Sequence, residues 1–203
     1  MILPRVAHGV KVMSIGMFIG TNQAIVWRGP MLHRALEQFL TDVHWGDLDV
    51  LFLDLPPGTG DIAISVAQLL PQSELLVVTT PQHAAAQVAQ RAGSIAVQTS
   101  QKVAGVIENM SHMTMPDGST LDVFGSGGGD DVAQNLTDTL DYPVRVLGQV
   151  PLDPPVRIGG DDGTPAVIAH PESVASTVFR DMAHELSHRS RGLSGRSLGV
   201  TPS

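Results

Sequence analysis

The chain has 203 residues, of which 42% are hydrophobic and 16% are charged, and this balance excludes intrinsic disorder over most of its length. The formal net charge of −8 argues against a nucleic-acid-binding surface, because phosphate contacts need clustered cations. Cysteine is absent, which excludes disulfides, thiolate metal sites and a thiol nucleophile. The sequence shows neither a signal peptide at its start nor an apolar run that would cross a membrane. We therefore expect an acidic, cytoplasmic α/β protein.

Short apolar runs alternate along the chain with segments of helical periodicity. Two of the runs are almost continuously apolar, which is typical of strands that are covered on both faces. The intervening segments repeat apolar residues at the 3.6-residue helical period. This alternation favours an α/β fold with a parallel sheet flanked by helices on both faces. The predicted strands are 10–15, 49–54, 74–79, 103–108 and 144–150, and the predicted helices are 30–43, 62–70, 83–99, 128–140 and 172–188.

The length of the chain suits one large domain, which we predict to cover residues 1–188. Residues 109–129 are rich in Gly, Ser and Asp and are predicted to form a long polar loop, a kind of loop that is usually functional or mobile. Residues 189–203 place three arginines among Ser and Gly, and we predict a disordered basic tail there.

The segment Asp54-Leu-Pro-Pro-Gly-Thr-Gly-Asp61 follows a predicted apolar strand. Ligands of parallel sheets bind beyond the carboxyl ends of the strands, and an Asp there can hold a Mg²⁺-bound water. Gly58 would let the backbone approach a terminal phosphate and donate its N–H. Asp61 has a simpler interpretation, as the N-cap of the next helix. The pattern therefore favours a Mg²⁺-linked role for Asp54 in particular.

Several further segments stand in one order with this motif and together carry a family resemblance. They resemble the Mrp/ApbC branch of the MinD/ParA-type P-loop ATPases, whose members act as iron–sulfur cluster carriers. The resemblance covers almost the whole chain and implies the P-loop NTPase fold. The segments are Trp27-Arg-Gly-Pro-Met31, Asp54-Leu-Pro-Pro-Gly-Thr-Gly-Asp61, Thr79-Thr-Pro-Gln82, Gly105-Val-Ile-Glu-Asn-Met-Ser111, Phe124-Gly-Ser-Gly-Gly-Gly129 and Pro151-Leu-Asp153.

The resemblance implies a role for each residue of a nucleotide site. ATP and Mg²⁺ would be the cofactors, and the site would lie at the interface of a homodimer that serves iron–sulfur apo-protein clients. Without the resemblance, the preferred interpretation of Asn109 is a turn residue at the end of a strand, which is a common use of Asn. The implied residues are Asp54 as the catalytic, Mg²⁺-linked acid, Gly58 as the γ-phosphate contact, Asn109 as the reader of adenine, Pro151 and Asp153 as the loop beside the base, and Arg28, Thr59 and Asp61 as switch residues.

The first departure from the family pattern is a missing phosphate loop. Neither Lys11 nor Lys102 stands in a Gly-Lys-[Ser/Thr] motif. The family's loop follows its first strand, so we expect Met1 to be an internal methionine of a longer protein and the first βαβ unit to be missing. We expect this chain alone to bind ATP poorly, to hydrolyse it negligibly and to be marginally stable.

The second departure is the absence of the family's Cys-x-x-Cys motif, which lies between Asn-Met-Ser and Phe-Gly. In this chain the corresponding segment is His112-Met-Thr-Met-Pro-Asp-Gly-Ser119 and contains no cysteine. An iron–sulfur cluster normally needs thiolates, so no residue of this chain is predicted to ligate one. A metal held by His112 and Asp117 is the less favoured reading. We expect this segment to serve instead as a dimer contact or a partner-recognition segment.

The motif His184-Glu-Leu-Ser-His188 matches the H-E-x-x-H pattern of zinc peptidases on a predicted helix. A catalytic zinc needs a third protein ligand, and no His, Asp or Glu follows His188. We therefore interpret the motif as two surface histidines.

The two remaining hypotheses for the whole chain are an Mrp-type ATPase and a non-catalytic dimerisation or partner-binding module on the same fold. The absent phosphate loop favours the module, whereas Asp54, Gly58 and Asn109 favour the ATPase. Binding of Mg-ATP separates them.

Overall fold

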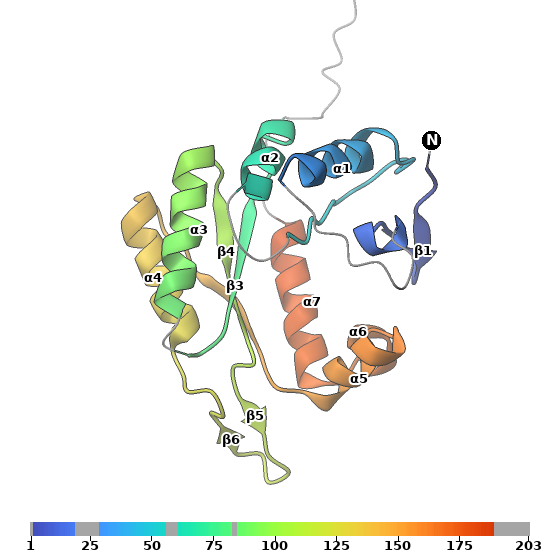
Figure 1. Cartoon of the computed structure of the whole chain (residues 1–203). Coiled ribbons are helices and arrows are strands. Elements are labelled where there is room, and N and C mark those ends of the chain that lie inside the picture. The colour runs from blue at the N-terminus through green and yellow to red at the C-terminus, as the bar shows by residue number, and fades with distance from the viewer. Residues whose placement is uncertain (1, 19–28, 56–60, 83–84, 189–203) are drawn as a thin grey trace, which may run out of the picture. The chain divides into compact units, whose positions relative to one another are not determined.

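The computed structural model describes residues 2–18, 29–55, 61–82 and 85–188 (Figure 1). Its contacts divide the chain into two compact units. The first unit is Met1–Leu75 with Ser94–Lys102, and the second is Leu76–Gly93 with Val103–Ser203. The assignment of residues 1–188 to a single domain stays a prediction, and the predicted tail 189–203 lies outside the described residues.

The first unit begins with a hairpin of β1 (Arg5–Ala7) and β2 (Val10–Val12), which pair antiparallel. Its two loop residues, His8 and Gly9, both have positive φ, at 51° and 80°. Such a two-residue turn matches the twist of the flanking strands, and glycine adopts it without steric cost. This unit also contains η1 (Ile15–Phe18), α1 (Gly29–Thr41) and α2 (Asp61–Leu69), and α1 packs against α2.

The second unit is built on a three-stranded sheet in the order β3-β4-β7. The strands are β3 (Leu75–Thr79), β4 (Val103–Asn109) and β7 (Val146–Val150). β4 and β7 run parallel, with an irregularity in the register after Val106. The helix α3 (Ala85–Thr99) connects β3 to β4 along the chain, which is the βαβ order that the sequence predicted.

Helices cover both faces of this sheet, α4 (Gly128–Leu140) on one side and α7 (Val174–Ser187) on the other (Figure 1). Strands alternate their side chains between faces, so β4 contributes to both layers. Val106 of β4 is fully buried, as are Val132 and Leu136 of α4. The α7 side holds a second apolar cluster of Val150, Ala175 and Met182 with Ile107, Leu147, Val156, Val178 and Phe179.

Several short elements were not predicted from the sequence. Part of the expected polar loop forms a hairpin of β5 (Met113–Thr114) and β6 (Thr120–Leu121). The helices α5 (Pro154–Asp162) and α6 (Ala166–Ala169) follow β7. The elements β5, β6 and α6 have only two to four residues, too few for a periodic apolar pattern to reveal them.

Two predicted strands are wrong. Residues 49–54 have no regular structure, and most of their apolar side chains are exposed, Phe52 at 71% and Val50 at 50%. A strand exists only where a neighbour accepts and donates its backbone hydrogen bonds, and no described strand pairs with this segment. In the predicted strand 10–15, only Val10–Val12 is extended, and it pairs antiparallel with β1 outside the parallel sheet.

Candidate functional site

The carboxyl ends of β4 and β7 bring two of the predicted nucleotide segments together. Asn109, the last residue of β4, pairs in register with Val150, the last residue of β7. The contact continues beyond the strands, because the Ser111 N–H donates to the Val150 carbonyl at 3.0 Å. The Leu152 N–H likewise donates to the His112 carbonyl at 2.7 Å. This pairing places Asn109 beside the segment that begins at Pro151.

Asn109 is exposed at this edge, and its side chain is oriented by the local backbone. Its Oδ1 accepts the N–H of Met110 at 2.9 Å, and Met110 has a positive φ of 57°. This tight turn at the strand end agrees with the turn role that Asn residues commonly take. It also fixes the plane of an amide that carries a donor and an acceptor.

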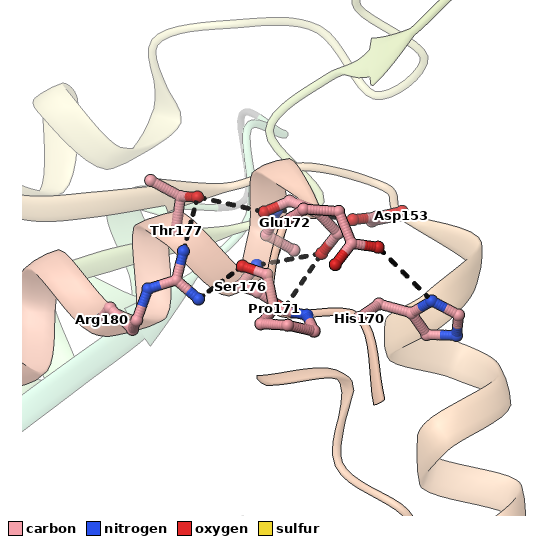
Figure 2. Close-up of polar contacts among 9 residues, drawn as sticks. Asp153, His170, Pro171, Glu172, Ser176, Thr177 and Arg180 are labelled. Atoms are coloured by element: carbon pink, nitrogen blue, oxygen red, sulfur yellow. Dashed lines mark hydrogen bonds and ion pairs between the residues drawn. The ribbon is translucent and has the colours of Figure 1, made fainter. Parts of the chain in front are cut away.

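The segment after β7 makes structural contacts through both of its predicted site residues. Pro151 is buried. Asp153 stands at the N-cap position of α5, but its carboxylate is directed at α7 (Figure 2). There Oδ2 accepts the N–H of Ala175 at 3.4 Å, in the first turn of α7. The carboxylate therefore helps to hold the start of α7, and its role beside a base stays a prediction.

The start of α7 is itself closely hydrogen-bonded (Figure 2). The Ser173 hydroxyl caps the helix by accepting the N–H of Ser176 at 3.2 Å. The Arg180 guanidinium donates to the carbonyl of Pro171 and, at 3.0 Å, to the hydroxyl of Thr177. The Ser173 hydroxyl thereby satisfies one of the N–H groups that a helix start otherwise leaves without a partner.

Glu108 is a site residue that the sequence analysis missed. It is 1% exposed, and its Oε2 accepts the N–H of Gly129 at 2.6 Å. Its Oε1 accepts Nε2 of Gln149 at 3.0 Å. One carboxylate thus connects β4 with β7 and with the first turn of α4. An acid at the end of an apolar strand was a usable signal, since burial of a carboxylate requires such partners.

The glycine-rich segment before α4 packs closely against this edge. A Cβ on Gly128 would lie 2.4 Å from the Thr80 carbonyl oxygen, and a Cβ on Gly129 would lie 2.9 Å from Glu108. Only glycine allows this approach. Because the Gly129 N–H is already bonded to Glu108, this helix start does not offer that donor to a phosphate.

The other predicted residues are not brought to this edge by any described contact. Asp54 belongs to the first unit and is exposed, in a stretch without regular structure. Asp61 is the first residue of α2. Arg28, Gly58 and Thr59 lie outside the described residues.

At the carboxyl edge of the sheet, the described residues present the exposed side-chain amide of Asn109. The exposed Asn109 amide is the type of group that recognises a base edge. No group of three or more His, Cys, Asp or Glu side chains suited to a metal occurs in the described part of the chain. Each helix among the described residues is too short or too polar to span a lipid bilayer.

The interval of the missing cysteines is an ordered turn in the structure. Oδ1 of Asp117 accepts both the N–H and the hydroxyl of Ser119, at 2.9 and 2.6 Å. These two hydrogen bonds lower the pKa of the exposed Asp117 carboxyl, and the bond from the Ser119 hydroxyl has the larger effect. His112 contacts the Ser111 hydroxyl through Nδ1 at 3.1 Å. Both candidate metal ligands therefore already have local partners.

The H-E-x-x-H motif lies at the end of α7, where both histidines are exposed. The carboxylate of Glu185, which would have to activate water in a peptidase, forms an ion pair with Arg145. The interpretation of the motif as two surface histidines agrees with this arrangement.

Comparison with known proteins identifies relatives that are named iron–sulfur cluster carrier proteins. An iron–sulfur cluster carrier protein of Mycobacterium bovis is 61% identical over 202 residues, which cover 100% of this chain and 53% of that relative. The chain thus spans about half the length of the curated relatives it matches.

Solved structures agree with the fold. The nucleotide-binding protein of Archaeoglobus fulgidus, in complex with ADP and with cobalt found in it, has a TM-score of 0.64 and 29% identity over 84% of this chain and 63% of its own. The cell division ATPase MinD of Pyrococcus furiosus has a TM-score of 0.53 and 21% identity, covering 80% of this chain and 62% of its own. This likeness confirms the predicted MinD/ParA-like fold class.

The sequence profile that matches residues 1–187 is described as ParA, the NUBPL iron-transfer P-loop NTPase. The match covers far more than half of the chain. The chain therefore belongs to the ParA family of NUBPL-type iron-transfer P-loop NTPases.

Proposed function

We propose that this chain carries the base-binding and switch segments of an Mrp-type, ATP-dependent iron–sulfur cluster carrier. The observation that supports this most directly is the pairing of β4 with β7, which brings Asn109 beside the Pro151 segment. The names of the relatives, which are iron–sulfur cluster carrier proteins, support the choice of cargo.

In this proposal the Asn109 amide reads the base, and the segment from Pro151 to Asp153 flanks it. Glu108 holds the start of α4 and so keeps the strand end in place. Mg²⁺ would neutralise phosphate charge, with Asp54 holding it through a bound water, and Gly58 would contact the γ-phosphate. Arg28, Thr59 and Asp61 would respond to the nucleotide.

We further propose that the protein acts in the cytoplasm as a homodimer that delivers clusters to apo-proteins. The cluster is the cargo, and this chain contains no cysteine to ligate it. Thiolates from another source would therefore have to hold the cluster during transfer.

Titration of the full chain with Mg-ADP and Mg-ATP, followed by calorimetry, tests the nucleotide role. We expect weak binding, since the sequence has no Gly-Lys-[Ser/Thr] loop. Asn109→Ala should weaken it by about ten-fold, which corresponds to loss of one or two hydrogen bonds. Asn135→Ala is the matched control, because Asn135 is also exposed and bonds only to its own helix, at the Asp131 carbonyl. Equal affinities for the two variants would contradict the role of Asn109.

A second candidate function is a non-catalytic dimerisation or partner-binding module. The β5–β6 hairpin favours it, because Met113 and Leu121 stand opposite each other and are 36% and 50% exposed. Opposed residues of an antiparallel pair share one face, so the hairpin presents an apolar face to solvent. Absence of nucleotide binding at millimolar concentration would leave this candidate in place of the first.

A further inference from the structure

The β5–β6 hairpin has one polar face and one apolar face. Thr114 and Thr120 stand opposite each other on the polar face. Met113 stands opposite Leu121 on the apolar face, and Met115 shares that face because side chains two residues apart along a strand point the same way. All three apolar side chains are exposed, Met115 at 37%. We call Met113, Met115 and Leu121 the hairpin face.

Hydrogen bonds in the turn hold this face on a defined backbone. The Met115 N–H donates to the Ser119 carbonyl at 2.8 Å, which continues the pairing of the two strands. The Gly118 N–H donates to the Met115 carbonyl at 2.9 Å, and Gly118 has a positive φ of 83°. Pro116 and Gly118 occupy the positions that favour them in a three-residue hairpin loop. The hairpin face is therefore already ordered and loses little entropy when a partner binds.

The hairpin is anchored at the carboxyl edge of the sheet and extends beyond it (Figure 1). The backbones of Ser111 and His112, at its base, are bonded to the segment around the end of β7. The apolar cluster on the α7 side of the sheet includes none of the hairpin-face residues. A two-stranded hairpin is at best marginally stable in water, and an antiparallel sheet usually packs its apolar face on other structure. The hairpin face is thus an apolar surface open to a partner.

The segment that contains the hairpin carries acidic residues but no lysine or arginine between positions 103 and 144. The exposed acids of the hairpin and of the adjoining start of α4 are Asp117, Asp122, Asp130 and Asp131. A second copy of the chain, docked face to face, would bring Asp117 and Asp122 toward the same carboxylates, and like charges across an interface oppose association. Basic residues around an apolar contact would instead complement this surface.

We propose that the hairpin face is a docking site for a basic amphipathic segment of another protein. The apolar side chains of that segment cover the hairpin face, and its lysines or arginines lie toward Asp117 and Asp122. Methionine suits such a surface, because its flexible side chain adapts to the shape of a partner. This proposal rests on the partner-binding candidate described above and does not require a nucleotide.

The test measures binding of the full chain to a synthetic amphipathic peptide of leucine and lysine, by fluorescence anisotropy and without nucleotide. Leu121→Thr should weaken binding by about five-fold or more, because it removes a central apolar contact while threonine still favours a strand. Met113→Thr should act in the same direction. Ile168→Thr is the matched control, because Ile168 on α6 is also 50% exposed, and it should leave the affinity unchanged.

A second peptide, with glutamate in place of lysine, tests the charge of the partner. It should bind at least about ten-fold more weakly than the lysine peptide. Asp122→Asn should weaken binding of the lysine peptide by about two- to five-fold, which is typical of one exposed ion pair. Asp181→Asn is the control for this variant, because Asp181 is also exposed but lies on α7.

The proposal would be overturned by a lack of binding of the lysine peptide at about 100 μM, by equal losses in Leu121→Thr and Ile168→Thr, or by equal affinities for the two peptides. Sedimentation of the chain alone tests the other occupant. A dimer that Leu121→Thr dissociates would show that a second copy covers the hairpin face, and would also overturn the proposal. Circular dichroism verifies that the variants fold. The nucleotide titration is a separate measurement, so its failure would affect the nucleotide role alone.

Discussion

Two short segments of this chain are similarly rich in apolar residues but have different structures. β4 in the second unit and residues 49–54 in the first unit are both short and rich in Val, Leu, Ile or Phe. In β4, Val103 is 5% exposed and Val106 is fully buried. In the other segment, Phe52 is 71% exposed. Apolar composition is therefore not sufficient to make a buried strand.

The difference lies in the neighbours of the two segments. β4 has β3 on one side and β7 on the other, so both edges of its backbone are hydrogen-bonded. Within the described residues, no strand pairs with residues 49–54. A strand is stabilised by partners that are distant in sequence, and without them its backbone groups remain with water.

Truncation of a buried and an exposed side chain gives the largest contrast between these regions. Leu136→Ala, which affects the fully buried layer against β4, should lower the free energy of unfolding by about 2–5 kcal/mol. Phe52→Ala should change it by less than about 0.5 kcal/mol, because its ring is already in water. Urea denaturation followed by circular dichroism measures both. Equal losses would show that residues 49–54 are packed in solution.

A methyl group added at the start of α4 tests how closely this helix approaches the sheet edge. Gly128→Ala should destabilise the chain by about 1–3 kcal/mol, because the new Cβ meets the backbone of Thr80 and Pro81, at distances down to 2.4 Å. Gly160→Ala is the control, since it lies inside α5 with open space around it. This control should stabilise by about 0.5–1 kcal/mol, and thermal melting compares the two. A neutral Gly128→Ala would mean that α4 can move away from β3.

Removal of the buried carboxylate tests the connection between β4, β7 and α4. Glu108→Leu leaves the Gly129 N–H without its acceptor and should cost about 1–3 kcal/mol. Glu108→Gln keeps an oxygen for that N–H and should cost less. Denaturation of both variants in urea gives the order. Identical losses would show that volume, and not hydrogen bonding, determines the effect.

The smallest expected effect is the pH response of the β5–β6 turn. The pKa of Asp117 is lowered in the folded chain, so its carboxylate stabilises the turn above the unfolded-state pKa, near pH 4. That contribution is lost as the pH falls through the lower, folded-state pKa. The Ser119 amide resonance should therefore titrate with a midpoint below pH 4, and Asp117→Asn should abolish the titration. A midpoint at or above pH 4 would contradict the hydrogen bonds of this turn.

Much of the second unit was predictable from local pattern. The helix predicted at 128–140 matches α4, and the runs 74–79, 103–108 and 144–150 correspond to β3, β4 and β7. Helical periodicity identified α4, which buries one face against the sheet, and short apolar runs identified the three strands. The order of the motifs also predicted the family that the sequence profile confirms.

The candidate site was predicted only in part. Asn109 and the Pro151 segment were named from the family motif, and the structure brings their backbones together. Glu108 was missed because its partners, Gly129 and Gln149, are 21 and 41 residues away. The role of the Asp153 carboxylate at the start of α7 was missed for the same reason, since Ala175 is 22 residues away.

The α/β class, the positions of the long helices and the lack of cysteine ligands in this chain could be predicted from local periodicity and residue type. Which apolar runs became strands, and which polar residues came into contact, depended on tertiary packing. Strand pairing and burial of a carboxylate depend on groups far apart along the chain, whose proximity is set by the packing of the whole unit.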